Sequence, residues 1–182
     1  MTSERFDRCF KILVGHEGGL STVRDDPGNW TGGKIGAGKL AGTKFGISAA
    51  SFPTLDIANL TIEQARDVYR ARYWHPIRGD QLPPGLGLLV FDSAVNNGVG
   101  QAIRWLQGAA GVRMDGDLGP VTLAAAQRPG VDAAFHLRRA MAMTEMAGWP
   151  SFGKGWAIRL ATLPFQAATL DQIEARSQSP AG

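Results

Sequence analysis

Glycine is the feature that most constrains what this chain can fold into. Of 182 residues, 24 are glycine, which is roughly twice the usual share of about 7%. Ten of them fall between Gly15 and Gly46 without a Gly-X-Y period, so a collagen-like chain is excluded. Because glycine tolerates backbone conformations that other residues avoid, the first quarter of the chain is predicted to contain turns and irregular backbone.

The composition indicates a folded domain and argues against a nucleic-acid partner. The chain is 44% hydrophobic and 19% charged, so it can bury a core within one domain, or one domain with a small appendage. Basic residues divide 11 before Gly98 and 8 after it, and neither half carries the basic stripe typical of nucleic-acid binding. The net charge of +3 would suit an anionic polymer such as a cell wall.

Cysteine and histidine give no indication of a metal or redox site. Cys9 is the only cysteine, which excludes an internal disulfide and a cysteine-based zinc site. The three histidines, His16, His75 and His136, are too scattered for the spacing of metal ligands. No cofactor is therefore expected.

The sequence shows no pattern of a membrane span or a signal peptide. No apolar run approaches 18 residues, and the first ten residues, MTSERFDRCF, lack an apolar signal-peptide core. We expect the product to be synthesised in the cytoplasm and not to insert stably into a membrane.

Hydrophobic periodicity predicts a mainly α-helical protein. Ser3 can cap a first helix that Gly18 and Gly19 end, and Thr61 forms a capping box with Gln64 at the start of another helix. Further helices are predicted at residues 86–97, at 101–110, from Pro120, at 131–147 and at 155–168, the last with a break at Pro164. The mostly apolar residues 86–97 are typical of a buried helix.

The glycine-rich stretch between the first two predicted helices is expected to form a small β-hairpin region. Pro27 and Asn29 are turn residues, and Lys44 to Ser48 have the composition of a short strand. The sequence therefore predicts an α+β protein whose β part is small and lies after the first helix.

Glu17 has the surroundings of a general acid. It lies four residues after Leu13 and seven after Phe10, which would place its carboxylate on the apolar face of the first helix and at the helix C-terminus. Burial and the helix dipole both raise a carboxyl pKa, as proton donation near neutral pH requires. The alternative is a structural Glu in the last helical turn before a glycine stop.

Asp26 and Thr43 are weaker candidates when each is taken alone. Asp26 begins the sequence DPGN, and an Asp before Pro-Gly commonly opens a turn. Thr43 precedes the strand-like FGIS and could present its hydroxyl from a turn, but most such threonines are ordinary strand residues.

Five motifs taken together are specific. They are HEGG at residues 16–19, DDPGN at 25–29, GTKFGIS at 42–48, RYWHPI at 72–77 and FDSAVNNG at 91–98. In combination they resemble glycoside hydrolase family 108, the bacteriophage-type N-acetylmuramidases. AIRWLQ at 102–107 and DGDLGPVT at 115–122 are similar to the small module, predicted to bind peptidoglycan, that usually accompanies this family. The resemblance covers roughly residues 5 to 170.

The resemblance implies a lysozyme-like fold and a domain division. Residues 1–97 are expected to form the muramidase region. Residues 98–170 are expected to form a helical, predicted peptidoglycan-binding region packed into the same globule, and residues 171–182 a frayed tail. The two roles left open for residues 98–170 are glycan binding and completion of the fold.

The resemblance also implies the catalytic residues. The related phage-type lysozymes have a Glu, an Asp after eight intervening residues, and a Thr on the following strand, and Glu17 and Asp26 have this separation. The third position departs from the pattern, because a glycine-rich insert at residues 29–42 separates Asp26 from the strand. Thr43 is assigned the role and Thr31 is the alternative, while the insert is expected to form a mobile flap beside the saccharide groove.

Four further residues are candidates for binding substrate. His16 adjoins the proposed acid, Trp30 could stack on a sugar ring, and Asn96 and Asn97 could reach the saccharide groove. Each has a structural alternative: His16 as a surface residue, Trp30 as a loop anchor, and the asparagines as a helix end.

The function implied is cleavage of the β-1,4 bond between N-acetylmuramic acid and N-acetylglucosamine by a monomeric endolysin, which a holin-type pore would release to the periplasm. The bond could be cleaved with inversion or retention of configuration. Two other functions stay open: a lytic transglycosylase acting on the same bond, and a non-catalytic peptidoglycan-binding protein.

Overall fold

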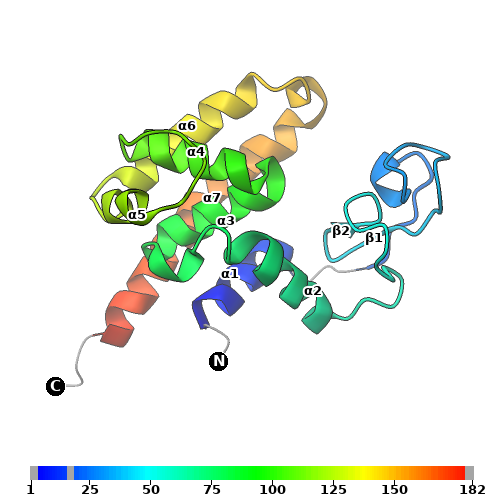
Figure 1. Ribbon diagram of the computed structural model, residues 1–182, viewed down its shortest axis with the longest axis horizontal. Coiled ribbons are helices and arrows are strands. Elements are labelled where there is room, and N and C mark those ends of the chain that lie inside the picture. The colour runs from blue at the N-terminus through cyan, green and yellow to red at the C-terminus, as the bar shows by residue number, and fades with distance from the viewer. Residues whose placement is uncertain (1–3, 16–18, 179–182) are drawn as a thin grey trace. The chain divides into compact units, whose positions relative to one another are not determined.

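The computed structural model describes residues 4–15 and 19–178, and the statements below concern these residues. They form a mainly α-helical protein with one small sheet (Figure 1). The α-helices are α1 (Glu4–Val14), α2 (Ile62–Tyr69), α3 (Pro84–Asn97), α4 (Val99–Ala109), α5 (Pro120–Ala126), α6 (Val131–Thr144) and α7 (Trp149–Gln178). The strands are β1 (Thr43–Lys44) and β2 (Ile47–Ser48). The predicted mainly α, lysozyme-like fold class is confirmed.

The chain divides into two compact units. The first, called the loop unit here, is Phe10–Ala71, and the second, called the helical unit, combines Met1–Cys9 with Arg72–Gly182. The predicted boundary between residues 97 and 98 stays a prediction.

The loop unit contains the short sheet that the sequence predicted after the first helix. β1 and β2 pair antiparallel, with Thr43 opposite Ser48 and Lys44 opposite Ile47. The Tyr69 hydroxyl at the end of α2 donates a hydrogen bond of 3.0 Å to the Phe45 carbonyl between the strands. Tyr69 thereby fixes the hairpin turn to α2.

The capping box predicted for the second helix is present. The Gln64 amide donates to the Thr61 hydroxyl at 3.2 Å, and the Thr61 amide donates to the Gln64 side chain at 2.9 Å. Two amide groups that a helix start leaves unpaired are thus satisfied, and α2 begins where the sequence predicted.

The helical unit is built around α3. This helix is buried from Gly85 to Ala94 and packs against α4, α6 and α7, as its apolar composition predicted. Trp74 and Phe91 meet edge to face with ring centroids 5.3 Å apart, a favoured geometry for aromatic pairs. Cys9 is also buried, which raises the pKa of its thiol to about 12 and makes it an apolar core residue.

α7 is longer than the sequence predicted and passes through Pro164 without a break. It continues to Gln178, beyond residue 171, where a frayed tail was expected. The Asp171 carboxylate accepts a hydrogen bond of 2.7 Å from the Gly85 amide, and the Glu174 carboxylate is paired with Arg5. Asp171 and Glu174 therefore hold the C-terminal part of α7 against the rest of the helical unit. Their polarity had suggested a solvated tail.

Candidate active site

The proposed acid Glu17 and its neighbour His16 lie outside the described residues. The helix expected to carry Glu17 ends at Val14, earlier than the predicted stop at Gly18 and Gly19. Gly15 follows with φ +66° and donates its amide to the Lys11 carbonyl at 3.0 Å. A glycine with positive φ is a common helix terminator, so the end of α1 has a local physical cause that spacing alone did not identify.

Asp26 holds an exposed carboxylate in a defined orientation. It caps the short 3-10 turn Pro27–Asn29, and its Oδ1 accepts a hydrogen bond of 2.8 Å from the Gly28 amide. This is the turn-opening interaction expected of an Asp before Pro-Gly. The same contact restricts the carboxylate to one orientation at the surface of the loop unit.

Asn29 connects the Asp26 turn to the start of β1. Its side chain is fully buried and donates to the Val23 carbonyl at 2.9 Å, while its own carbonyl accepts from the amides of Ala41 and Gly42, both at 3.0 Å. In the sequence, Asn29 stands out only as a turn residue of the DDPGN motif. Its burial shows that it positions the turn bearing Asp26 relative to the strand bearing Thr43.

Thr43 is half-buried at the first position of β1 and is held by backbone pairing on two sides. It exchanges hydrogen bonds with Ser21, of 2.8 and 2.9 Å, and pairs with Ser48 across the sheet. Gly42, immediately before it, has φ +87°, and a Cβ there would lie 2.6 Å from the Ser21 carbonyl oxygen. Only glycine fits this close approach.

Thr31, the alternative third residue, uses its hydroxyl inside the insert. The Thr31 Oγ1 accepts from the Lys39 amide at 2.9 Å, the Thr31 amide donates to the Lys39 carbonyl at 2.9 Å, and Trp30 forms a bridge with Leu40. The insert expected as a flap is therefore closed on itself by hydrogen bonds. The choice between Thr43 and Thr31 as the third site residue stays a prediction.

Trp30 is anchored within the loop unit. Its indole Nε1 donates to the Arg24 carbonyl at 2.8 Å and its side chain is half-buried. The contact fits the loop-anchor alternative, and stacking on a sugar ring stays a prediction.

A cavity of about 560 Å³ lies in the loop unit. Thr31 and Lys39 of the insert line it together with the segment 53–58. Neither Asp26 nor Thr43 belongs to its lining, so this cavity is separate from the carboxylate proposed for catalysis.

Asn96 and Asn97 belong to the helical unit, at the end of α3. Asn96 is exposed and donates to the Asp92 carbonyl at 2.8 Å, which is a local helix contact. Asn97 is half-buried, and its Oδ1 accepts from Arg139 Nε at 3.2 Å. Because its oxygen is used in this way, the group that Asn97 can offer a ligand is its amide Nδ2.

Arg139 is part of a buried ion cluster that the sequence did not reveal. Its Nη1 lies 2.6 Å from Asp92 Oδ2, and both side chains are completely buried. Arg159 binds the other carboxylate oxygen with its Nε at 2.6 Å and its Nη2 at 2.5 Å. Asp92 therefore has a structural role as the counter-ion of two arginines. The sequence did contain one sign of this cluster. Arg139 lies four residues from both Phe135 and Met143, so it falls on the apolar face of α6, where an arginine needs a buried partner.

The described residues contain no group of three His, Cys, Asp or Glu side chains that could hold a metal ion. Within the same part of the chain, no helix combines the length and apolarity needed to cross a membrane.

Comparison with known proteins bears on the segment that carries the proposed catalytic residues. Residues 10–98 match the model of the family described as Glycosyl hydrolase 108. Residues 10–98 are thus similar to the glycosyl hydrolase 108 family. At the level of the family, it supports a glycoside hydrolase with a glycan substrate, as predicted. No match was found among curated proteins.

The fold of the whole chain resembles a solved structure. The structure of Brucella abortus SagA matches with a TM-score of 0.76 and 27% sequence identity, over 91% of this chain and 95% of that chain. The similarity extends well beyond the glycosyl hydrolase 108 segment and therefore includes the C-terminal helices.

Proposed function

We propose that the chain is a peptidoglycan hydrolase of the lysozyme type that cleaves the β-1,4 bond between N-acetylmuramic acid and N-acetylglucosamine. The observation that carries the proposal is the glycosyl hydrolase 108 match over residues 10–98, which contain Glu17, Asp26 and Thr43. The ordered, exposed carboxylate of Asp26 and its connection through Asn29 to the strand of Thr43 support the same assignment.

In the proposed mechanism, protonated Glu17 donates its proton to the glycosidic oxygen as the bond to the anomeric carbon breaks. Positive charge then develops on the sugar ring, and Asp26 and Thr43 act from the opposite face. A water that Asp26 positions would give an inverted product, whereas direct attack by Asp26 would give a retained one. The anomeric configuration of the first product distinguishes these two roles for Asp26.

The groups proposed to hold the saccharide are His16, Trp30, Asn96 and Asn97. Trp30 would contribute an aromatic face, and Asn97 would contribute its amide Nδ2 as a donor, since Arg139 binds its oxygen. We also propose that residues 98–170 contribute to binding the wall, in keeping with their similarity to the module that accompanies this family.

The proposed biological role is that of an endolysin, which reaches the periplasm through a holin-type pore. Expression in a Gram-negative host with and without a co-expressed holin tests this role. Lysis that requires the holin agrees with it, whereas equal lysis in both cultures contradicts it.

The catalytic assignment is tested by clearing of chloroform-treated Gram-negative cells. We expect Glu17→Gln to reduce the rate of clearing by at least about 100-fold, because general acid catalysis contributes roughly 10²- to 10⁴-fold. Asp26→Asn should also reduce the rate strongly. Asp25→Asn is the matched control, since Asp25 is an exposed carboxylate next to Asp26. Unchanged clearing by Glu17→Gln would contradict the assignment.

A further inference from the structure

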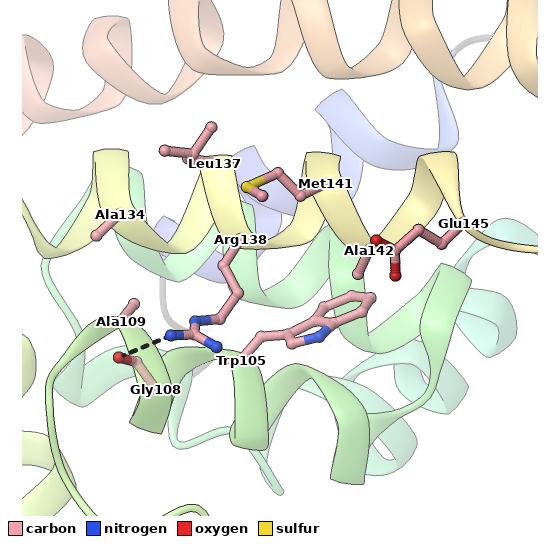
Figure 2. Close-up of a pocket in the computed structure, with 9 residues that line it drawn as sticks. All are labelled: Trp105, Gly108, Ala109, Ala134, Leu137, Arg138, Met141, Ala142 and Glu145. Carbon is pink, nitrogen blue, oxygen red and sulfur yellow. Dashed lines mark hydrogen bonds between the residues drawn. The ribbon is translucent and has the colours of Figure 1, made fainter.

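A groove between α4 and α6 of the helical unit has the lining of a ligand site. Its volume is about 480 Å³, within the range of pockets that hold small ligands. Its lining consists of Trp105, Gly108, Ala109, Ala134, Leu137, Arg138, Met141, Ala142 and Glu145. Figure 2 shows the Arg138 and Trp105 side chains between the two helices, with Leu137 and Met141 drawn on the other side of α6 in this view. We call this set the α4–α6 groove.

Apolar atoms form most of the α4–α6 groove. Trp105 is 5% exposed, whereas Leu137 and Met141 on α6 are 61% and 60% exposed. Two large apolar side chains held in water at the edge of a groove are costly unless a ligand covers them. The groove therefore suits a ligand with aliphatic atoms along its length.

The cation in the groove is Arg138, whose guanidinium lies next to Gly108 of α4. Arg138 Nη2 lies 3.4 Å from the Gly108 carbonyl oxygen, and Figure 2 shows the side chain reaching toward α4 at this point. A Cβ on Gly108 would lie 2.8 Å from Arg138 Cζ. Because residue 108 has no side chain, the guanidinium can lie against the backbone of α4, and a guanidinium is suited to binding a carboxylate.

The groove also contains an anionic side chain, Glu145, which is well separated from Arg138. Glu145 follows Arg138 by seven residues along the chain, and Figure 2 shows it at the end of the groove beyond Ala142. Seven residues of helix rise about 10 Å, which an extended peptide spans with about three residues. The groove thus offers one positive and one negative group, separated by apolar surface.

This pattern selects among classes of ligand. A neutral saccharide has no charged group for either end, and Glu145 would repel the phosphates of a nucleic acid. A short peptide with a carboxylate and an ammonium group about three residues apart complements both ends and covers the apolar middle.

We propose that the α4–α6 groove binds the peptide stem of peptidoglycan, with a stem carboxylate on Arg138 and the free amine of diaminopimelate on Glu145. The choice of this peptide rests on the proposed function, because peptidoglycan is the substrate proposed for the chain. The site would let the enzyme bind stems whose diaminopimelate amine is not cross-linked, while the loop unit acts on the glycan.

The test is calorimetric titration of the full chain with the soluble tetrapeptide L-Ala-γ-D-Glu-meso-diaminopimelate-D-Ala. We expect Arg138→Gln and Glu145→Gln each to weaken binding roughly tenfold, since a charge-assisted hydrogen bond contributes about 1.5 kcal/mol or more. Gly108→Ala should weaken binding by displacing the guanidinium without removing its charge. Arg176→Gln removes an exposed charge on α7, outside the groove, and this variant should bind the tetrapeptide like the wild type.

A second probe tests the Glu145 end alone. The same tetrapeptide with its diaminopimelate amine acetylated should bind the wild type about as weakly as the unmodified peptide binds Glu145→Gln. The acetylated peptide should bind Glu145→Gln with little further loss of affinity. Wild-type affinity in both Arg138→Gln and Glu145→Gln would overturn the proposal, as would absence of tetrapeptide binding to the wild type.

The peptide site and the proposed hydrolase activity can be overturned independently of one another. Tetrapeptide binding that depends on Arg138 and Glu145, in a protein that does not cleave peptidoglycan, would overturn the proposed function and support the peptide site. Cleavage of peptidoglycan without tetrapeptide binding would overturn the peptide site alone.

Discussion

At the scale of single residues, the buried Asp92 carboxylate is expected to contribute strongly to the free energy of unfolding of the helical unit. Asp92 is the counter-ion of the buried Arg139 and also binds Arg159. Removing one partner of a buried ion pair leaves an uncompensated charge, at a cost of about 3–5 kcal/mol. We expect Asp92→Asn to lower the free energy of unfolding by about 3 kcal/mol in urea titrations. Asp132→Asn, an exposed carboxylate on α6, is the control, and equal stability of both variants would contradict the prediction.

His136, beside this cluster, should make stability depend on pH. Burial lowers the pKa of His136 and the nearby Arg139 guanidinium lowers it further, against a hydrogen bond to the Leu160 backbone and the Asp92 charge, which raise it. The unfolded chain therefore takes up a proton on His136 at a higher pH than the folded chain. The stabilisation is complete above the ordinary histidine pKa of about 6.5 and is lost as pH falls toward the folded value.

The corresponding measurement is the urea midpoint between pH 7.5 and pH 5. We expect wild type to lose stability across this interval and His136→Gln to lose less, because the variant has no imidazole to protonate. Parallel pH profiles for the two proteins would show that His136 is not the source of the effect.

At the scale of elements, Gly42 determines how β1 begins. A side chain at this position meets both an unfavourable φ of +87° and the Ser21 carbonyl oxygen, whereas Gly36, with φ +79°, has open space around it. We expect Gly36→Ala to cost about 1–2 kcal/mol from backbone conformation alone and Gly42→Ala to cost at least about 1 kcal/mol more. Gly42→Ala should also slow clearing of cells, because β1 carries Thr43. Equal unfolding free energies would contradict the assigned close contact.

Elements with strong local signals could be predicted from the sequence. The capping box of Thr61 and Gln64 and the apolar composition of α3 determine their own structure, and both predictions are confirmed. The end of α1 and the length of α7 could not be predicted, because they depend on the conformation of Gly15 and on the distant partners of Asp171 and Glu174.

The candidate site could be predicted only in part, for the same reason. Its motifs identified the segment that matches glycosyl hydrolase 108, whereas the roles of Asn29 and Arg139 follow from tertiary contacts that spacing does not encode. The charge pattern of the α4–α6 groove is likewise invisible in sequence, since Arg138 and Glu145 resemble ordinary surface residues of a helix.

At the scale of the whole molecule, the segment that matches the family depends on the C-terminal helices. It ends with α3, whose buried face packs against α4, α6 and α7. We expect a fragment of residues 1–97 to aggregate or to lack a cooperative thermal transition, because α3 would expose Leu86, Leu89 and Phe91 to water. A soluble, monomeric fragment with a cooperative transition would contradict this, and would support residues 1–97 as an independent domain.

The most direct test of the proposed function is mass spectrometry of the soluble products released from purified peptidoglycan. Hydrolysis by the wild type should release muropeptides with reducing N-acetylmuramic acid ends, which gain mass on borohydride reduction, and Glu17→Gln should release almost none. Products with anhydro ends would identify a lytic transglycosylase instead, and the absence of any product would identify a protein that binds the wall without cleaving it. Either result would contradict the proposal of a lysozyme.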